Sequence, residues 1–294
     1  MRPADESLIF KYAILLGDKA LGNKTEDENP KKEDDKDSVT NRVAGFICKH
    51  VFTEHTSYVT GLAVVGKEAG FGTTYLISAG WDRRILLWDL EKARLHDVFR
   101  RAELKSTESE ELASDGIIMD LTYSVERNEF AYASSDKLVY IRQFSNKGNE
   151  MTLSAILQGH EAEVTQVKWS SISSKWVTGS EDGTIRVWSA DGMSCDLVLS
   201  ALGAVSALCI DQVNGCIVAG VQEVIRVYDP EARKIVQKNV GHTDSVRCLI
   251  HIPERSQYIS ASWDKTVRIW NAYKKTGRKR ANVEFRENDE ESDN

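Results

Sequence analysis

Residues 260–270 read SASWDKTVRIW, and nearly the same sequence occurs at residues 178–188 (TGSEDGTIRVW) and 78–89 (SAGWDRRILLWD). Each copy has a hydroxyl residue, an Asp four residues later, and a Trp six residues after that Asp. Self-similarity of this kind decides the architecture of a chain before any single residue is interpreted, so we treat the copies as units of a repeat protein.

The repeat extends over five units, because strand-like runs of the same pattern also occur between the three copies. The first run of each unit opens at an apolar residue: Val59, Ile118, Val164, Val205 and Val246. The last three of these positions are evenly spaced by 41 residues. Apolar and polar residues alternate within the runs, and turn residues separate them, which predicts an all-β antiparallel meander.

A His stands upstream of each of the three copies, at His55, His160 and His242, and the last two lie in Gly-His pairs. The Gly-His, the Asp in the second turn and the Trp ending the third strand resemble the signature of the WD40-repeat family. The resemblance covers roughly residues 43–272. It implies a β-propeller of four-stranded blades around a central channel, with about five recognisable blades where the family usually builds seven.

The resemblance also implies a hydrogen-bonded tetrad of His, hydroxyl, Asp and Trp inside each of three blades. By position the tetrads are His55, Ser78, Asp82 and Trp88; His160, Thr178, Asp182 and Trp188; and His242, Ser260, Asp264 and Trp270. Ser180 and Ser262, two residues further on, are alternatives for the hydroxyl. A buried Asp needs donors, which His and the hydroxyl supply, so we expect these His–Asp pairs to be structural rather than catalytic.

Two units lack most of the tetrad. Their residues at the His, Asp and Trp positions are Ser114, Asp136 and Arg142 in the second unit, and Ala201, Gln222 and Tyr228 in the fourth. The strand patterns survive, so both still count as blades. Without the internal hydrogen bonds, we expect these two blades to open more readily than their neighbours.

The closure of the ring depends on the ends of the chain. After Trp270 the sequence shows no fourth strand for its unit, whereas residues 43–53 form a strand with no blade of their own. We therefore expect this N-terminal strand to close the last blade. Alternatively, residues 7–16 contribute to a sixth blade, the ring is completed to seven, or another chain completes an incomplete propeller.

The resulting domain plan has three parts. They are an N-terminal segment with a disordered charged insertion (1–42), the propeller (43–272) and a charged disordered tail (273–294). The five cysteines are odd in number and scattered, which is typical of free thiols in a reducing compartment. No apolar run is long enough to span a bilayer, so we expect no membrane association.

The charge balance limits the class of partner. The chain has 38 basic and 45 acidic residues, for a net charge of −7, whereas nucleic-acid binding requires a positive field. We therefore expect protein or peptide partners, no nucleic acid, and a cytoplasmic protein. A basic cluster within residues 274–280 leaves nuclear residence as an alternative.

The candidate binding surface comes from the residue before the turn Asp, which in the WD40 family points to the rim around the channel. These positions are Trp81, Ser135, Glu181, Val221 and Trp263. Trp and Arg dominate interface hot spots, so Trp81, Arg83, Arg84, Trp263 and Lys265 are the candidate partner-binding residues. No catalytic, cofactor-binding or metal-binding motif is present in the sequence.

These residues predict a non-catalytic interaction scaffold or adaptor. One alternative is an incomplete propeller that acts as a structural subunit of a larger multiprotein assembly. A propeller enzyme is a further alternative, which the missing motifs disfavour.

Overall fold

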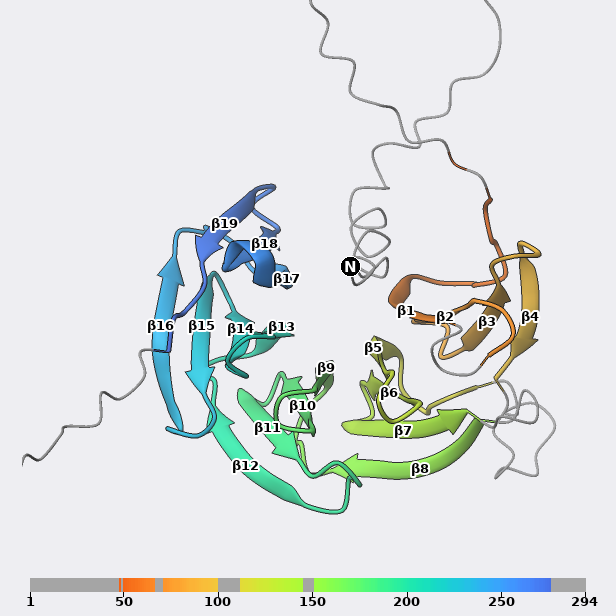
Figure 1. The fold of residues 1–294 in the computed structure, drawn as a ribbon, viewed down its shortest axis with the longest axis horizontal. Coiled ribbons are helices and arrows are strands. Elements are labelled where there is room, and N and C mark those ends of the chain that lie inside the picture. The colour runs from red at the N-terminus through yellow and green to blue at the C-terminus, as the bar shows by residue number, and fades with distance from the viewer. Residues whose placement is uncertain (1–47, 49, 67–70, 100–111, 145–150, 276–294) are drawn as a thin grey trace, which may run out of the picture.

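The computed structural model describes residue 48 and residues 50–66, 71–99, 112–144 and 151–275. Nineteen strands lie in these ranges, where the one helical element is a 3-10 turn, η2 (Pro253–Arg255). The strands form five antiparallel sheets that follow one another around a central axis (Figure 1). The predicted all-β propeller with about five blades is confirmed.

Each blade is a meander of strands that pair in sequence order. Four blades have four strands: β1 (Val59–Val65), β2 (Tyr75–Gly80), β3 (Ile85–Asp89) and β4 (Arg94–Val98); β5 (Ile118–Ser124), β6 (Glu129–Ser134), β7 (Leu138–Phe144) and β8 (Met151–Gln158); β9 (Val164–Ser170), β10 (Lys175–Ser180), β11 (Thr184–Trp188) and β12 (Cys195–Ser200); β13 (Val205–Ile210), β14 (Ile217–Val221), β15 (Val224–Asp229) and β16 (Lys234–Val240). The fifth, within the described residues, has three: β17 (Val246–Ile252), β18 (Gln257–Ser262) and β19 (Val267–Asn271).

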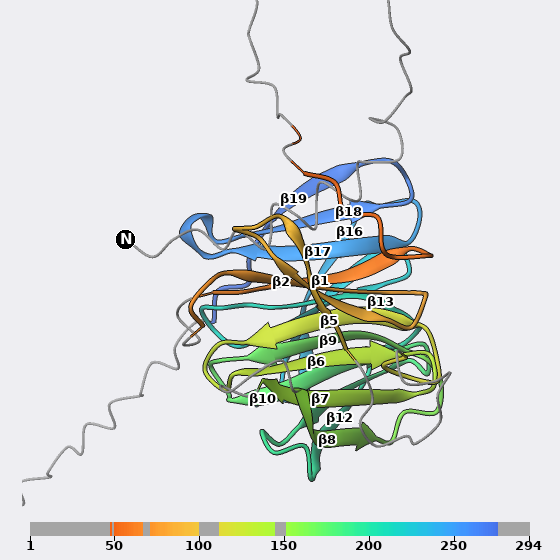
Figure 2. The same cartoon turned by 90° about the vertical axis from the view of Figure 1, so that its right-hand side faces the viewer.

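The first strand of each blade lies nearest the centre and the last lies outermost (Figure 1). Seen edge-on, the strands run between the two faces of the arc (Figure 2). Since every blade repeats the same meander, the turns joining second and third strands all lie on one face. We call this the rim face.

Three hydroxyl groups connect neighbouring blades. The pairing of each first strand shifts register at its second residue, which leaves that residue unpaired in a β-bulge. There Thr60, Thr165 and Ser206 each donate a 2.6 Å hydrogen bond to the carbonyl that opens the next blade. In the second and fifth blades the same position holds Met119 and Arg247 instead.

Neighbouring sheets pack so closely that one position of the second strand requires a small residue. A Cβ on Gly179 would lie 2.5 Å from the Cγ1 atom of Val205 in the next blade. Successive side chains along a strand point to opposite faces of the sheet, so each blade packs against the blade before it and the blade after it. Ile185 and Val187 pack toward the fourth blade, whereas Trp176 and Trp188 pack toward the second.

The predicted closure by residues 43–53 is wrong in its described part. Residues 50–53 form no strand, and the ring of Phe52 lies 4.5 Å from that of Trp88 in the first blade. Phe52 thus packs with the apolar cluster of Leu76 and Leu86 instead of pairing with β19. The remaining positions of that stretch, and residues 7–16, lie outside the described residues.

Within the described residues, the first and last blades form the two ends of an arc, with an opening between them (Figure 1). The fifth blade exposes residues that its neighbours bury. Val267 and Ile269 are each 61% exposed, whereas the equivalent Ile185 and Val187 of the third blade are 0% and 5% exposed. Among the described residues, the fifth blade is therefore the least covered.

Candidate functional site

The structure brings the twelve predicted tetrad residues together in three sets. In each, His Nδ1 lies 2.7 Å from an Asp oxygen, and His Nε2 lies 2.7 Å from a side-chain hydroxyl. The hydroxyls are Ser78, Thr178 and Ser260, and each accepts the indole N–H of its Trp at 2.7–2.9 Å. Each set links the turn, the second strand and the third strand of one blade.

The two alternative hydroxyls have a different task. Ser180 donates to the carbonyl of Glu163 and Ser262 to that of Asp244, each at 2.8 Å. Both therefore tie the loop that enters the blade to the turn that holds the tetrad Asp. The sequence left this choice open because residues two apart on a strand face the same side.

The tetrad geometry leaves no free reactive group. In the third blade, His160 uses both ring nitrogens, and Thr178 Oγ1 accepts from Trp188 while it faces His160 Nε2. His160 is 7% exposed, and Thr178 is fully buried. A nucleophile or general base needs access to a substrate, so this arrangement supplies rigidity rather than chemistry.

The charges in the third tetrad are distributed in a specific way. Burial raises the pKa of Asp182, but donors from Thr184, His160 and the Glu161 backbone outweigh it and lower the pKa to about 2. Burial lowers the pKa of His160 below its usual 6.5 despite the neighbouring carboxylate. The pair is therefore a neutral imidazole that donates to a carboxylate.

The second blade replaces the tetrad with a different network. Tyr132 stands at the hydroxyl position, and its phenol donates to the carbonyl of Ala113 at 2.7 Å and accepts from Arg142 Nε at 3.0 Å. The guanidinium of Arg142 also lies 4.3 Å from the ring centre of Phe99. Tyr140 donates to Asp136 at 2.9 Å. The expectation that this blade lacks internal hydrogen bonds is therefore wrong.

The fourth blade replaces the tetrad with apolar packing. Ala219 stands at the hydroxyl position, and it packs with Ala201 and Tyr228 in one buried cluster. The Tyr228 phenol donates to the carbonyl of Ala201 at 3.2 Å. No Asp follows because the turn between β14 and β15 is shorter.

That shorter turn also corrects one rim assignment. Val221 pairs with Val205 as Ser180 pairs with Val164, so Val221 ends the strand and is 1% exposed. The turn consists of Gln222, with a φ of 55°, and Glu223, and both are exposed. The sequence pattern could not place it, because the Asp that anchors the count is missing.

The two tryptophans of the rim face are exposed. Trp81 is 42% and Trp263 is 62% exposed. Trp81 meets the edge of Tyr58 at 5.0 Å between ring centres, and the guanidinium of Arg247 lies 5.6 Å from the ring of Trp263. Both rings thus combine apolar surface with a neighbouring polar group, the composition favoured in interface hot spots.

The basic residues beside these tryptophans belong to the same turns. Arg83 and Lys265 have left-handed φ values of 63° and 68°, which turn the chain immediately after each tetrad Asp. Arg84 Nη1 donates to the carbonyl of Glu54 at 3.1 Å, and Arg83 Nη1 to that of Asp115 at 3.4 Å. The candidate partner-binding residues therefore lie in the first and last blades, on either side of the opening.

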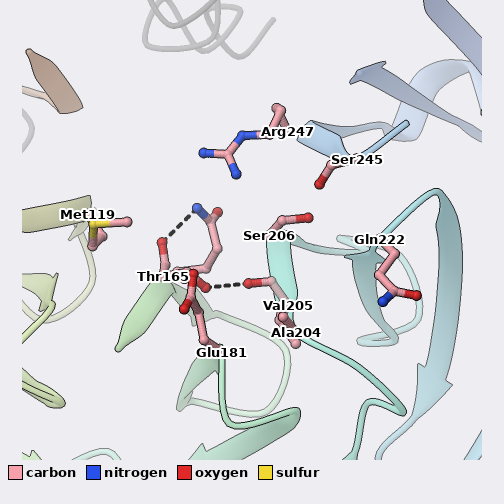
Figure 3. Close-up of a pocket in the computed structure, with 10 residues that line it drawn as sticks. Met119, Thr165, Glu181, Ala204, Val205, Ser206, Gln222, Ser245 and Arg247 are labelled. Atoms are coloured by element: carbon pink, nitrogen blue, oxygen red, sulfur yellow. Dashed lines mark hydrogen bonds between the residues drawn. The ribbon is translucent and has the colours of Figure 1, made fainter. Parts of the chain in front are cut away.

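A pocket of about 180 Å³ is lined by residues of the second to fifth blades (Figure 3). Its lining includes the bulge residues Met119, Thr165, Ser206 and Arg247. Figure 3 shows the Arg247 guanidinium reaching from the last blade toward the middle of this space. This pocket was not predicted from the sequence. The one signal for it in the sequence is that these four residues occupy the same position in four successive repeats.

Across the described stretches, no group of three or more His, Cys, Asp or Glu side chains is arranged to hold a metal ion. Nor does any helix found in them have the length and apolarity to cross a membrane.

The fold and the three tetrads define a class: an antiparallel β-propeller in which internal His–Asp hydrogen bonds fix three of the blades. The family model for the WD domain, G-beta repeat (WD40), matches residues 46–89, 151–189 and 233–271. These are the three units that carry a tetrad. The chain therefore carries WD40 repeats in three places.

Relatives of this chain are WD-repeat proteins of differing function. The ribosome biogenesis protein YTM1 of Meyerozyma guilliermondii is 25% identical over 234 residues, which are 67% of this chain and 51% of that protein. The ribosome biogenesis protein WDR12 homolog of Nematostella vectensis is 27% identical over 139 residues, or 47% of this chain and 28% of that protein. Striatin-4 of Mus musculus is 26% identical over 237 residues, or 77% and 30%. The chain spans about half or less of the length of these relatives.

Proposed function

We propose that this protein is a non-catalytic scaffold that binds a protein or peptide partner on its rim face. The observation that carries the proposal is the exposure of Trp81 and Trp263, each on a turn that also presents a cation. Trp and Arg are among the residues most enriched in interface hot spots.

The pocket supports the same surface. Arg247, Glu181 and Gln222 place positive, negative and amide groups around a space of about 180 Å³. A peptide side chain of moderate size fits such a space, with the tryptophans contacting the flanking residues. The chain's net charge of −7 disfavours a nucleic acid as the partner.

The test compares partner recovery by two double variants. Trp81→Ala with Trp263→Ala removes the proposed anchors, and Met193→Ala with Val213→Ala removes two exposed apolar side chains from turns on the opposite face. Quantitative mass spectrometry after affinity purification should show roughly tenfold or greater loss of partners for the first variant alone. Unchanged recovery by the tryptophan variant, with its circular dichroism intact, would remove the rim assignment.

A second candidate is a structural subunit of a larger multiprotein assembly. The exposed Val267 and Ile269 favour it, because the equivalent Ile185 and Val187 of the third blade are buried. In that case the assembly survives the loss of both tryptophans, and Val267→Asp with Ile269→Asp disrupts it. We further infer residence in the cytoplasm or nucleus, since all five cysteines are unpaired.

A further inference from the structure

Arg247 occupies a position that three other blades use for a structural hydrogen bond. It is the second residue of β17, and the equivalent Thr60, Thr165 and Ser206 each donate to the carbonyl that opens the next blade. Arg247 makes no such bond within the described residues. Its side chain is instead exposed, and its guanidinium lies 5.6 Å from the ring of Trp263. The arginine is therefore free of the task that its position has elsewhere in the molecule.

The guanidinium of Arg247 has no counter-ion in the described part of the chain. Glu181 lines the same pocket from the third blade, and neither residue takes part in any of the ion pairs formed there. A guanidinium presents five N–H donors in a planar fork that matches the two oxygens of a carboxylate. The donors of Arg247 are therefore available to a ligand that enters the pocket.

Other groups of the pocket suit the same ligand. Ser245 and Gln222 line it, and neither side chain has a hydrogen-bond partner among the described residues. Figure 3 shows the Ser245 side chain directed toward the same space as the Arg247 guanidinium. Met119 and Ala204 add apolar surface, against which the methylene groups of a ligand can pack. The pocket thus combines one unpaired cation, neutral donors and a short apolar wall.

The volume of the pocket limits the ligand to a single side chain. Pockets that hold a whole small molecule measure roughly 300–1,000 Å³, whereas this one measures about 180 Å³. The exposed indole of Trp263, beside Arg247, is then available to a residue that flanks the bound one. A partner chain that contacts both Trp81 and Trp263 extends beyond the pocket, so an internal residue rather than a chain end occupies it.

We propose, on the basis of the rim face as the binding surface, that the pocket binds the side-chain carboxylate of a Glu or Asp in a partner peptide, with Arg247 as its main donor. A bidentate pair of Arg and carboxylate is among the stronger charge-assisted contacts. Glu181 selects against a phosphorylated residue. A phosphate carries a charge of roughly −1.5 to −2 and is repelled more strongly by Glu181 than a carboxylate is.

An array of random short peptides tests this assignment, because it requires no known partner. The peptides have acetylated and amidated ends, and the purified full-length protein is the probe. We expect Asp or Glu to be preferred over Asn and Gln at one position by roughly tenfold. Arg247→Gln should lose this preference. The matched control Arg255→Gln should keep it, since Arg255 is an exposed cation on the opposite face of the same blade.

Two further variants gain a property, which a disturbed fold cannot produce. Arg247→Glu should reverse the preference at that position from acidic to basic residues, because the pocket then repels a carboxylate. Glu181→Gln should raise the binding of phosphoserine peptides by roughly threefold and leave the binding of Glu peptides no weaker.

Three results would overturn the carboxylate assignment. They are an acidic preference that survives Arg247→Gln, binding only of peptides with a free C-terminus, and tighter binding of phosphoserine than of Glu by the unmodified pocket. Peptides that the Trp81→Ala and Trp263→Ala variant loses, but that show no acidic preference, would also refute it while leaving the rim face as the binding surface. If the tryptophan variant keeps every peptide, the proposed tryptophan surface is wrong instead.

Discussion

The third and fourth blades share one strand plan but are stabilised in opposite ways. The third blade is built around a polar tetrad. Within it, the Asp182 carboxylate accepts hydrogen bonds from His160, Glu161 and Thr184. The fourth blade places Ala219 and Tyr228 at equivalent positions and has no His or Asp there. Yet Trp188 and Tyr228 are buried alike, at 3% and 1% exposed.

The comparison teaches that the tetrad is one solution to a packing problem rather than a requirement of the fold. A buried polar network stabilises a structure when every group has a partner, and it is costly when one is missing. Apolar packing avoids that risk but fixes the turn less tightly. The two blades should therefore respond very differently to the same kind of substitution.

The largest difference is expected for the turn Asp. Asp182→Ala leaves the buried His160 ring and the Thr184 and Glu161 donors without their acceptor, which should lower the free energy of unfolding by about 3 kcal/mol. Gln222→Ala, in the exposed turn of the fourth blade, should change it by less than about 0.5 kcal/mol. Urea unfolding measures both, and equal losses would show that the tetrad is not what stabilises the third blade.

A smaller difference is expected from pH. Burial lowers the pKa of His160 below 6.5, against the attraction of Asp182 and with some repulsion from Arg186. Below pH 6.5 the unfolded chain therefore binds a proton that the folded blade does not, so stability falls as pH falls. Between pH 7.0 and 5.5 the opening free energy of the third blade should therefore decrease.

Hydrogen exchange at Ile185 and Ile225 compares the two blades at each pH. The fourth blade has Ala201 in place of the tetrad His, so the pH dependence of its opening comes from His251 of the fifth blade, which accepts from the Gln212 N–H and whose pKa is also lowered by burial. An equal drop at both positions would mean that the two blades open together as one cooperative unit.

Much of this contrast could be predicted from the sequence. The spacing of hydroxyl, Asp and Trp identified the repeat, and resemblance to a known family brought together His160, Thr178 and Asp182 before any coordinates. Such prediction succeeds because the signature residues occupy fixed positions in the hydrogen-bonded register of a blade. In the fourth blade the signature is absent, so Val221 was assigned to a rim position that Gln222 occupies.

Other features depended on contacts that a local pattern does not encode. Alternation predicted a strand near residues 43–53 but not its neighbour, and Phe52 packs on Trp88 of the first blade. Strand partners are set by long-range packing, which period-two alternation leaves open. Similarly, the substitution to Arg142 indicated a lost tetrad, whereas the partner that satisfies its guanidinium, Tyr132, lies on another strand.

The smallest expected effect sharpens the comparison most, because it changes one oxygen atom in each blade. Tyr228→Phe removes a 3.2 Å hydrogen bond to the Ala201 carbonyl, which keeps a 2.7 Å bond from Arg226 Nη1. No buried group is left unpaired, so the free energy of unfolding should fall by less than about 0.5 kcal/mol. Thr178→Val removes the third blade's hydroxyl with little change of volume and leaves both His160 Nε2 and the Trp188 indole N–H unpaired, which should cost about 2 kcal/mol. Urea unfolding measures the loss in free energy of unfolding for both variants. If Tyr228→Phe lost as much as Thr178→Val, the fourth blade would also depend on hydrogen bonding rather than on apolar packing.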